Sequence, residues 1–161
     1  GRAKLQPMIP LLTPEAVTRD TRAFVAWLDL QAAVDTARGI GAEGYCMGGP
    51  FAVRSTAAVP DRVRAAASFH GGGLATDKPD SPHRLLAGTR ASYLIAVARN
   101  DDVRNPQEKE TFRAAAAEAG RPAEIEVYNA DHGWCVPDSP VYDAAEADRA
   151  FARLLALYEK L

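Results

Sequence analysis

The sequence has little cysteine, little histidine and no long apolar run. Its 161 residues include two cysteines and three histidines. Because one disulfide is the most that two cysteines can form, and no other feature indicates secretion, we expect both thiols to be reduced and the protein to be cytoplasmic. No apolar run approaches the roughly 20 residues that cross a bilayer, and no signal peptide is recognisable. We therefore expect no membrane partner.

Neither sign of charge dominates the chain. There are 19 Lys and Arg residues against 21 Asp and Glu, which gives a net charge of −2 at pH 7. The two signs are interspersed, so we expect no nucleic-acid partner and no binding to an anionic membrane surface. The length suits one domain and is short for two, and we predict a single domain over residues 1–161.

Short apolar segments alternate with helical patterns along most of the chain. Strands are predicted at residues 40–45, 63–69, 92–98 and 123–128, the last with the alternation of a half-exposed strand near a sheet edge. Helices are predicted from Thr13-Pro14 onward, with Trp27 on the core face, and at residues 30–37, 50–59, 106–119 and 142–161, whereas residues 74–90 read as a loop. This order predicts an α/β fold with a parallel sheet flanked by helices.

The first predicted strand runs directly into a helix through Gly-Tyr-Cys-Met-Gly-Gly, residues 44–49. Such a corner exposes its central residue, here Cys46, and has the spacing of the G-x-S-x-G nucleophile elbow with Cys in place of Ser. We expect Gly44 and Gly48 to be required because a side chain would block so tight a turn. The following helix N-terminus favours a thiolate, and the N–H of Met47 is a candidate oxyanion donor.

Chemically capable residues follow each of the other strands. These are His70 after the second strand, Asp101 and Asp102 after the third, and His132 after the fourth. The carboxyl ends of parallel strands meet at one sheet edge, so these side chains are expected to converge with Cys46. Nucleophile, acid and histidine occur in the order of the α/β-hydrolase triad, which predicts His132 as the base and Asp102 or Asp101 as the acid.

Other interpretations of the same residues stay open. Cys46 could be a buried structural cysteine or a redox-sensing thiol, and the chain could be an inactive module that acts by association. His132 and Cys135 could belong to a zinc site completed by His70 or Cys46, although no C-x-x-C pair is present. His70 is expected to hydrogen-bond the Gly-rich turn that follows it, with a role in a substrate pocket as the alternative.

Four motifs resemble those of the dienelactone hydrolase family, which has the α/β-hydrolase fold. They are Gly-Tyr-Cys-Met-Gly-Gly, Ser-Phe-His-Gly-Gly, Asn-Asp-Asp and Tyr-Asn-Ala-Asp-His-Gly-Trp, and the likeness runs from about Phe24 to the end. The resemblance implies Cys46 as the nucleophile and His132 as the base. It favours Asp102 as the acid, because family members often have a proline four residues after it, as Pro106 is here. It also implies cleavage of lactones and activated esters through an acyl-thioester, without a metal or organic cofactor.

The resemblance carries two departures. Members have a further N-terminal segment that supplies strands and a second oxyanion donor, and these 161 residues do not include it, so we expect an α/β-hydrolase fold lacking its N-terminal strands. The chain is then expected to form a homo-oligomer or to pair with that segment. Members also bind a substrate carboxylate through Arg, whereas Trp134 follows His132 here. An apolar ester or thioester is thus as good a candidate substrate as a lactone, with Trp134 and His70 as candidate contacts.

Overall fold

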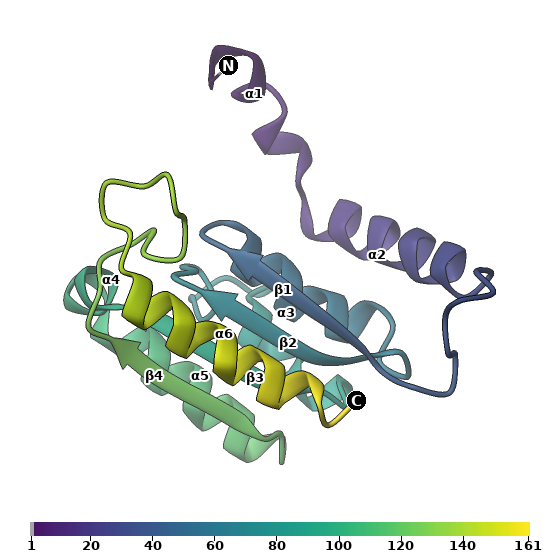
Figure 1. Cartoon of the computed structure of the whole chain (residues 1–161). Coiled ribbons are helices and arrows are strands. Elements are labelled where there is room, and N and C mark those ends of the chain that lie inside the picture. The colour runs from purple at the N-terminus through teal and green to yellow at the C-terminus, as the bar shows by residue number, and fades with distance from the viewer. Residues whose placement is uncertain (1) are drawn as a thin grey trace.

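The computed structural model describes residues 2–161 as a parallel sheet flanked by helices (Figure 1). The helices are α1 (Arg2–Leu5), α2 (Pro14–Leu28), α3 (Gly48–Ala58), α4 (Arg99–Arg104), α5 (Pro106–Glu118) and α6 (Ala144–Tyr158), with 3-10 helices η1 (Ile9–Leu11) and η2 (Pro82–Gly88). The strands are β1 (Ile40–Tyr45), β2 (Val63–Phe69), β3 (Ser92–Ala98) and β4 (Ala123–Tyr128). The predicted fold class is confirmed, and all four strands occupy their predicted positions.

The strands are parallel and lie side by side in chain order, β1-β2-β3-β4. The last residues of β1 and β2, Tyr45 and Phe69, lie opposite each other, as do Ala98 and Tyr128 of β3 and β4, while Phe69 lies opposite Ala96, two residues before the end of β3. The segments that leave the four strands therefore start from the same edge of the sheet, where ligands bind in open α/β sheets.

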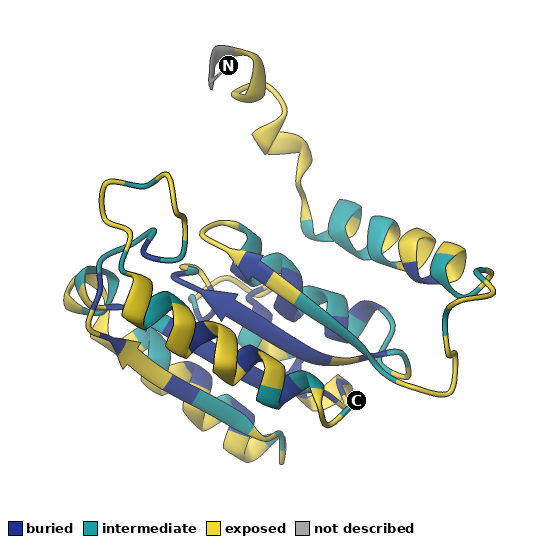
Figure 2. Cartoon of the chain, in the orientation of Figure 1, coloured by how far each residue is buried: buried dark blue, intermediate teal, exposed yellow. Residues whose placement is uncertain are grey.

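Helices cover both faces of this sheet (Figure 1). On one face α3, α5 and η2 enclose a core that includes Val53, Leu86, Ile95 and Phe112. On the other face α6 covers a second core, in which Leu154 and Leu157 pack near Phe69 and Leu94. The central strand β2 is buried almost throughout (Figure 2), as expected for a strand covered on both faces.

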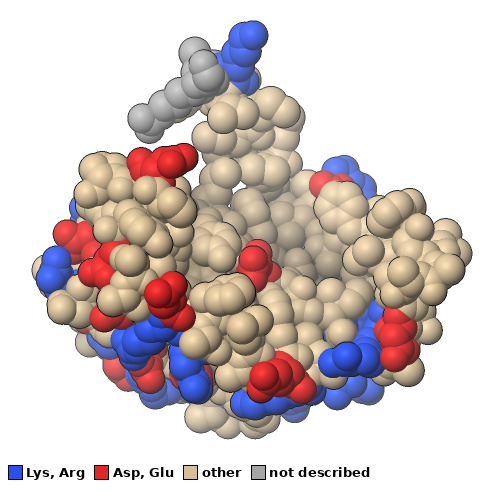
Figure 3. Space-filling view, in the orientation of Figure 1, with Lys and Arg blue, Asp and Glu red and all other residues tan. Residues whose placement is uncertain are grey.

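The N-terminal region projects from this body, and α2 packs along α3 (Figure 1). Thr21 meets Ser55 with their hydroxyl oxygens 3.1 Å apart, and Val25 is the buried residue of α2. Because this face points inward, Trp27 lies on the outer side and is 61% exposed. The prediction of a core position for Trp27 is therefore wrong. Figure 3 shows a hollow beside this arm that is lined mostly by uncharged side chains.

Three connecting segments differ from their predicted form. Residues 30–37 form turns instead of a helix, because the Asp35 carboxylate accepts the N–H of Ala37 and so competes with helical bonding. The predicted loop at residues 74–90 contains the 3-10 helix η2, and the short helix α4 follows β3 directly. Short helices of these kinds lack the periodicity from which longer helices are recognised.

Strand β1 pairs with β2 alone and is an edge strand among the described residues. Its outer N–H and C=O groups therefore have no strand partner in residues 2–161. No helix in the described part of the chain has the length and apolarity to span a bilayer.

Candidate active site

Cys46 occupies the corner between β1 and α3 in a strained backbone conformation. Its φ is +53°, it is exposed, and the Gly49 N–H donates to its carbonyl oxygen over 3.2 Å. L-residues enter this left-handed region only at a cost of about 1–2 kcal/mol, so the surrounding structure must hold the turn. The corner has the backbone form predicted from its sequence.

The glycines around the corner have different steric roles. A Cβ added to Gly44 would lie 2.0 Å from the carbonyl oxygen of Gly48, and one added to Gly49 would lie 2.2 Å from the Ser68 hydroxyl oxygen. A Cβ on Gly48 would meet no atom within 4 Å. The steric requirement predicted for Gly44 is confirmed, whereas the one predicted for Gly48 is wrong and belongs to Gly49.

We expect Gly44→Ala to destabilise the protein by about 3 kcal/mol or more, because its methyl group would overlap backbone that cannot move without opening the corner. Gly48→Ala is the matched control and should change the stability by no more than about 0.5 kcal/mol. Urea unfolding followed by circular dichroism measures both. Equal losses in the two variants would contradict this account of the corner.

His132 and Asp101 form a close pair next to this corner. The Nδ1 atom of His132 lies 2.6 Å from Oδ2 of Asp101, and the backbone N–H of His132 donates to Oδ1 of Asn100 over 2.9 Å. The carboxylate fixes the tautomer of the ring with the proton on Nδ1, which leaves Nε2 as the free basic nitrogen. The loop after β4 is thus anchored to the end of β3 by two neighbouring side chains.

The sequence favoured Asp102 as the partner of His132, and the structure shows that Asp102 has a different partner. Asp102 instead accepts a hydrogen bond from Lys109 of α5, with Nζ 2.5 Å from Oδ1. The cause is α4, because successive residues of a helix point about 100° apart and two adjacent carboxylates cannot face one histidine. Asp101 faces the β4 loop, while Asp102 faces α5.

His70 lies between the elbow and His132. It is 3% exposed, has φ +42°, and its Nδ1 accepts the N–H of Cys46 over 3.2 Å. Its ring centroid is 4.7 Å from that of His132 and 5.1 Å from that of Trp134. Burial, and then the neighbouring His132, lower the pKa of His70 to about 4, so the ring is neutral near pH 7.

This pKa makes the stability of the fold depend on pH. Unfolded histidine binds a proton below about pH 6.5, whereas folded His70 stays neutral down to about pH 4, so the unfolded state binds more protons in this window. We therefore expect the contribution of neutral His70 to the free energy of unfolding to be fully present above pH 6.5. This contribution should be lost as the pH decreases, with a loss approaching about 3 kcal/mol near pH 4. Urea midpoints measured between pH 7 and 4 test this, and His70→Asn should remove most of the slope.

Trp134 and His70 are buried beneath the site, which corrects their assignment as substrate contacts. Trp134 is 0% exposed and stacks on Tyr128, with ring centroids 5.1 Å apart. Neither the indole Nε1 of Trp134 nor the Nε2 of His70 has a hydrogen-bond partner among the described residues. The predicted side-chain hydrogen bond from His70 to the Gly-rich turn that follows it is not found among the described residues, and Nδ1 of His70 instead accepts the backbone N–H of Cys46 at the elbow.

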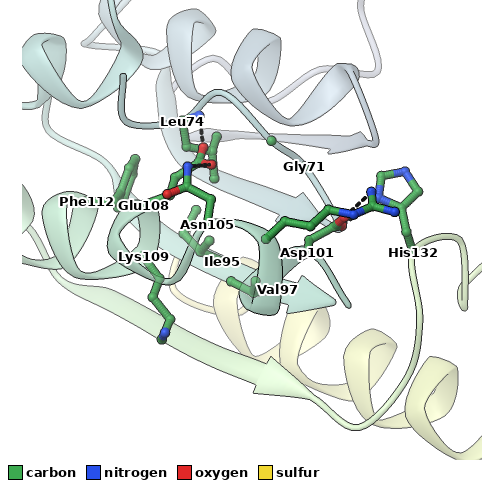
Figure 4. A pocket seen from close by; sticks show the side chains of 12 residues that line it. Gly71, Leu74, Ile95, Val97, Asp101, Asn105, Glu108, Lys109, Phe112 and His132 are labelled. Carbon is green, nitrogen blue, oxygen red and sulfur yellow. Dashed lines mark hydrogen bonds and ion pairs between the residues drawn. The ribbon is translucent and has the colours of Figure 1, made fainter. Parts of the chain in front are cut away.

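A pocket of about 210 Å³ opens beside the His132–Asp101 pair (Figure 4). Its walls include the apolar side chains of Leu74, Ile95, Val97 and Phe112. In Figure 4 the His132–Asp101 pair lies at one end and Glu108 at the other, where the Glu108 carboxylate accepts the N–H of Leu74. Its apolar middle and polar ends suit a small ligand with an uncharged body.

The structure thus gathers the sequence-predicted residues only in part. Cys46, His70 and His132 meet at one edge of the sheet, but no hydrogen bond joins the Cys46 thiol to His132 within residues 2–161. The N–H of Met47 has no backbone partner in the described chain and precedes the first turn of α3, a position open to an oxyanion. Both cysteines are free, and the cytoplasmic location stays a prediction.

The zinc alternative needs a cluster of donors. Within residues 2–161, no three His, Cys, Asp or Glu side chains lie together in a way that could hold a metal ion. That alternative therefore has no donor set in the described residues.

The sequence profile of the dienelactone hydrolase family matches residues 2–161. The chain belongs to the dienelactone hydrolase family. No curated protein sequence matches it. Among solved structures, a dienelactone hydrolase candidate from Klebsiella pneumoniae subsp. pneumoniae MGH 78578 is 24% identical with a TM-score of 0.82, over 95% of this chain and 64% of that one. A dienelactone hydrolase-like promiscuous phosphotriesterase from metagenomic libraries is 19% identical with a TM-score of 0.77, over 99% and 66%.

More distant hydrolases share the same fold. Porphyromonas gingivalis dipeptidyl peptidase 4 is 17% identical with a TM-score of 0.73, over 91% of this chain and 23% of that one. At these identities the likeness shows the fold, which is the α/β-hydrolase fold of the family. The chain spans just under two thirds of the length of its first dienelactone hydrolase-like neighbours.

Sequence reasoning missed several residues that shape this dienelactone hydrolase-family site. Asn100 anchors His132, Lys109 holds Asp102, and Glu108 closes the far end of the pocket. Asn100 begins the Asn-Asp-Asp motif after the third strand, but its contact with the His132 backbone was not predicted. Lys109 and Glu108 lie in a run of charged residues of mixed sign near the start of α5, and nothing in that run distinguishes them from a solvated helix face.

Proposed function

We propose that this dienelactone hydrolase-family protein hydrolyses a lactone or a small activated ester by covalent catalysis at Cys46. His132 is the general base and acid, Asp101 orients His132, and the N–H of Met47 stabilises the oxyanion. The observation that carries the proposal is the exposed Cys46 at φ +53°, at the same sheet edge as the hydrogen-bonded His132–Asp101 pair. A strained exposed nucleophile beside an oriented imidazole is the arrangement that covalent acyl transfer requires.

In the first half of the reaction, His132 holds the proton of the Cys46 thiol and the thiolate sulfur attacks the substrate carbonyl carbon. The carbonyl π electrons move to oxygen, and the N–H of Met47 donates to that oxyanion. The tetrahedral intermediate collapses, the C–O bond to the alcohol breaks, and the alkoxide takes the proton from His132. An acyl-thioester on Cys46 remains. The exposed thiol must turn towards Nε2 of His132 for this step.

In the second half, His132 removes a proton from water as the oxygen attacks the thioester carbon. The second tetrahedral intermediate expels the Cys46 thiolate and releases the carboxylic acid. The thiolate and the protonated imidazole are then restored. Asp101 stabilises the imidazolium through its 2.6 Å contact with Nδ1 in both halves.

The pocket beside His132 supports a small and largely apolar substrate. Its apolar walls are suited to an uncharged acyl or alcohol group. The ammonium group of Lys109 is already paired with Asp102, and the carboxylate of Glu108 accepts the N–H of Leu74. These two charges are engaged by the protein. The guanidinium of Arg104 also lines the pocket, 3.8 Å from Oδ1 of Asp101, and its side chain is largely exposed, so an uncharged ester or thioester and an anionic lactone both stay candidate substrates.

The experiment that tests this proposal is the capture of the acyl-enzyme. The protein is mixed with 4-nitrophenyl acetate at pH 7, quenched in acid and digested for mass spectrometry. We expect an acetyl group on Cys46 and a burst of one equivalent of 4-nitrophenol. Acetylation confined to lysine side chains, or peroxide-dependent sulfenic acid on Cys46 without ester turnover, would overturn the proposal.

We also propose that the open edge of β1 is covered in the functional protein, by a second copy of the chain or by a further N-terminal segment. An unpaired strand edge next to exposed apolar side chains favours association. We expect the 161-residue chain to sediment as a dimer or larger species. A monomer in sedimentation velocity at micromolar concentration would contradict this expectation.

A further inference from the structure

Two neighbouring residues with strained backbones meet at the ends of β1 and β2. Cys46 has φ +53° and His70 has φ +42°, and these are the positive-φ residues other than glycine in the described chain. The N–H of Cys46 donates to two acceptors, the carbonyl oxygen of Phe69 at 3.1 Å and Nδ1 of His70 at 3.2 Å. The side chain of the second strained residue therefore holds the backbone of the first.

This bond fixes the tautomer of His70. A backbone N–H can only donate, so Nδ1 of His70 must present its lone pair, and the ring proton lies on Nε2. Protonation of Nδ1 would break the bond to Cys46. The ring is 3% exposed and its Nε2 has no partner among the described residues, so no competing hydrogen bond draws it away from the elbow.

The position of the ring is set on its other sides as well. The rings of His70 and Trp134 form a T-shaped pair with centroids 5.1 Å apart, and the centroid of the His132 ring lies 4.7 Å from that of His70. The N–H of His70 donates to the carbonyl oxygen of Ala96 over 2.8 Å, which ties its backbone to β3. His70 is thus held by the sheet and by Trp134, while it contacts both the elbow and the base.

We propose that His70 is a positioning residue for the nucleophile, which holds the Cys46 peptide in its left-handed conformation through the acceptor nitrogen Nδ1. Without this acceptor the corner relaxes, and the thiol leaves its place at the start of α3. The inference rests on the proposed function in naming Cys46 as the nucleophile. It assigns to His70 a role that depends on a lone pair and not on contact with substrate.

Three substitutions separate the acceptor from the other properties of His70. His70→Asn keeps an acceptor near the Nδ1 position and tolerates positive φ. His70→Leu keeps much of the volume but has no acceptor, and His70→Gly tolerates positive φ but also has no acceptor. All three are made in a Cys135→Ala background, so that Cys46 is the one remaining thiol, and His83→Asn in the same background is the control for loss of a histidine elsewhere.

The readout is the second-order rate at which iodoacetamide alkylates Cys46 at pH 7, with folding checked by circular dichroism. We expect the Leu and Gly variants each to react about tenfold more slowly than the parent, and the Asn variant to stay within about threefold of it. If only the Leu variant is slow, backbone strain accounts for the loss and the proposal fails. It fails equally if only the Gly variant is slow, if the Asn variant is as slow as the other two, or if none is slow.

This readout is independent of ester turnover. If Cys46 does not acylate with 4-nitrophenyl acetate, the proposed hydrolase activity fails, while the alkylation rates of the four variants still decide whether His70 positions the thiol.

Discussion

Replacement of Cys46 by alanine should lower the turnover of an activated aryl ester by about 10⁴-fold or more and abolish the burst of aryl alcohol. The exposed sulfur at the corner of β1 and α3 is the atom that would form the acyl-thioester. The fold should be unaffected, because the Cys46 side chain lies outside both buried cores. Burst kinetics with 4-nitrophenyl acetate and a urea unfolding curve measure the two expectations on the same preparations.

Cys135→Ala is the matched control for this loss. Burial raises the pKa of the Cys135 thiol to about 12, so almost none of it is thiolate at neutral pH. We expect turnover within about threefold of the parent. A comparable loss in the two variants would show that the thiol at the elbow has no special role.

The second large effect is expected at Asp101. Asp101→Asn removes the carboxylate 2.6 Å from Nδ1 of His132 and should reduce turnover by about 10³-fold or more, because an amide favours the wrong tautomer and does not stabilise the imidazolium. The KM for the ester should change much less than kcat, since Asp101 acts through His132. Steady-state kinetics across a range of pH measure the loss.

For Asp102→Asn, at the adjacent position, we expect the opposite result: a loss of stability with little change in turnover. It breaks the pair with Lys109, in which both side chains are about one-fifth exposed, and should reduce stability by about 1 kcal/mol or more while turnover stays within about fivefold. The reverse order of the two effects on turnover would mean that the hydrogen bond between Asp101 and His132 is not the one used in the reaction.

The strands and the elbow were predictable because their signals are local. Residues 92–98 are a short apolar run, residues 40–45 are a short segment that leads into a Gly-rich corner, and at Gly44 the corner leaves no room for a Cβ. The position of His132 at the end of the last strand follows from the same pattern. Local sequence and parallel topology were enough to bring the nucleophile and the base to one edge.

The partner of His132 and the burial of Trp134 were not predictable in this way. The choice between Asp101 and Asp102 depends on a six-residue helix that directly follows β3, and one residue of helical phase decides which carboxylate meets the imidazole. Trp134 depends on a tertiary contact, the stacking on Tyr128. The prediction for Trp27 was wrong for the same reason. The helix face that carries Trp27 would be buried only if another element packed against it.

Because the two tryptophans differ in exposure, their fluorescence can report on a local part of the structure. Trp27 is 61% exposed on the projecting helix, whereas Trp134 is fully buried against Tyr128 and His70, two residues from His132. In a Trp27→Phe background, emission would come from the loop that carries the base, at the short wavelengths of a dry indole. A red shift on mild heating, before the far-ultraviolet circular dichroism changes, would then report the local opening of the β4–α6 loop while the sheet stays folded.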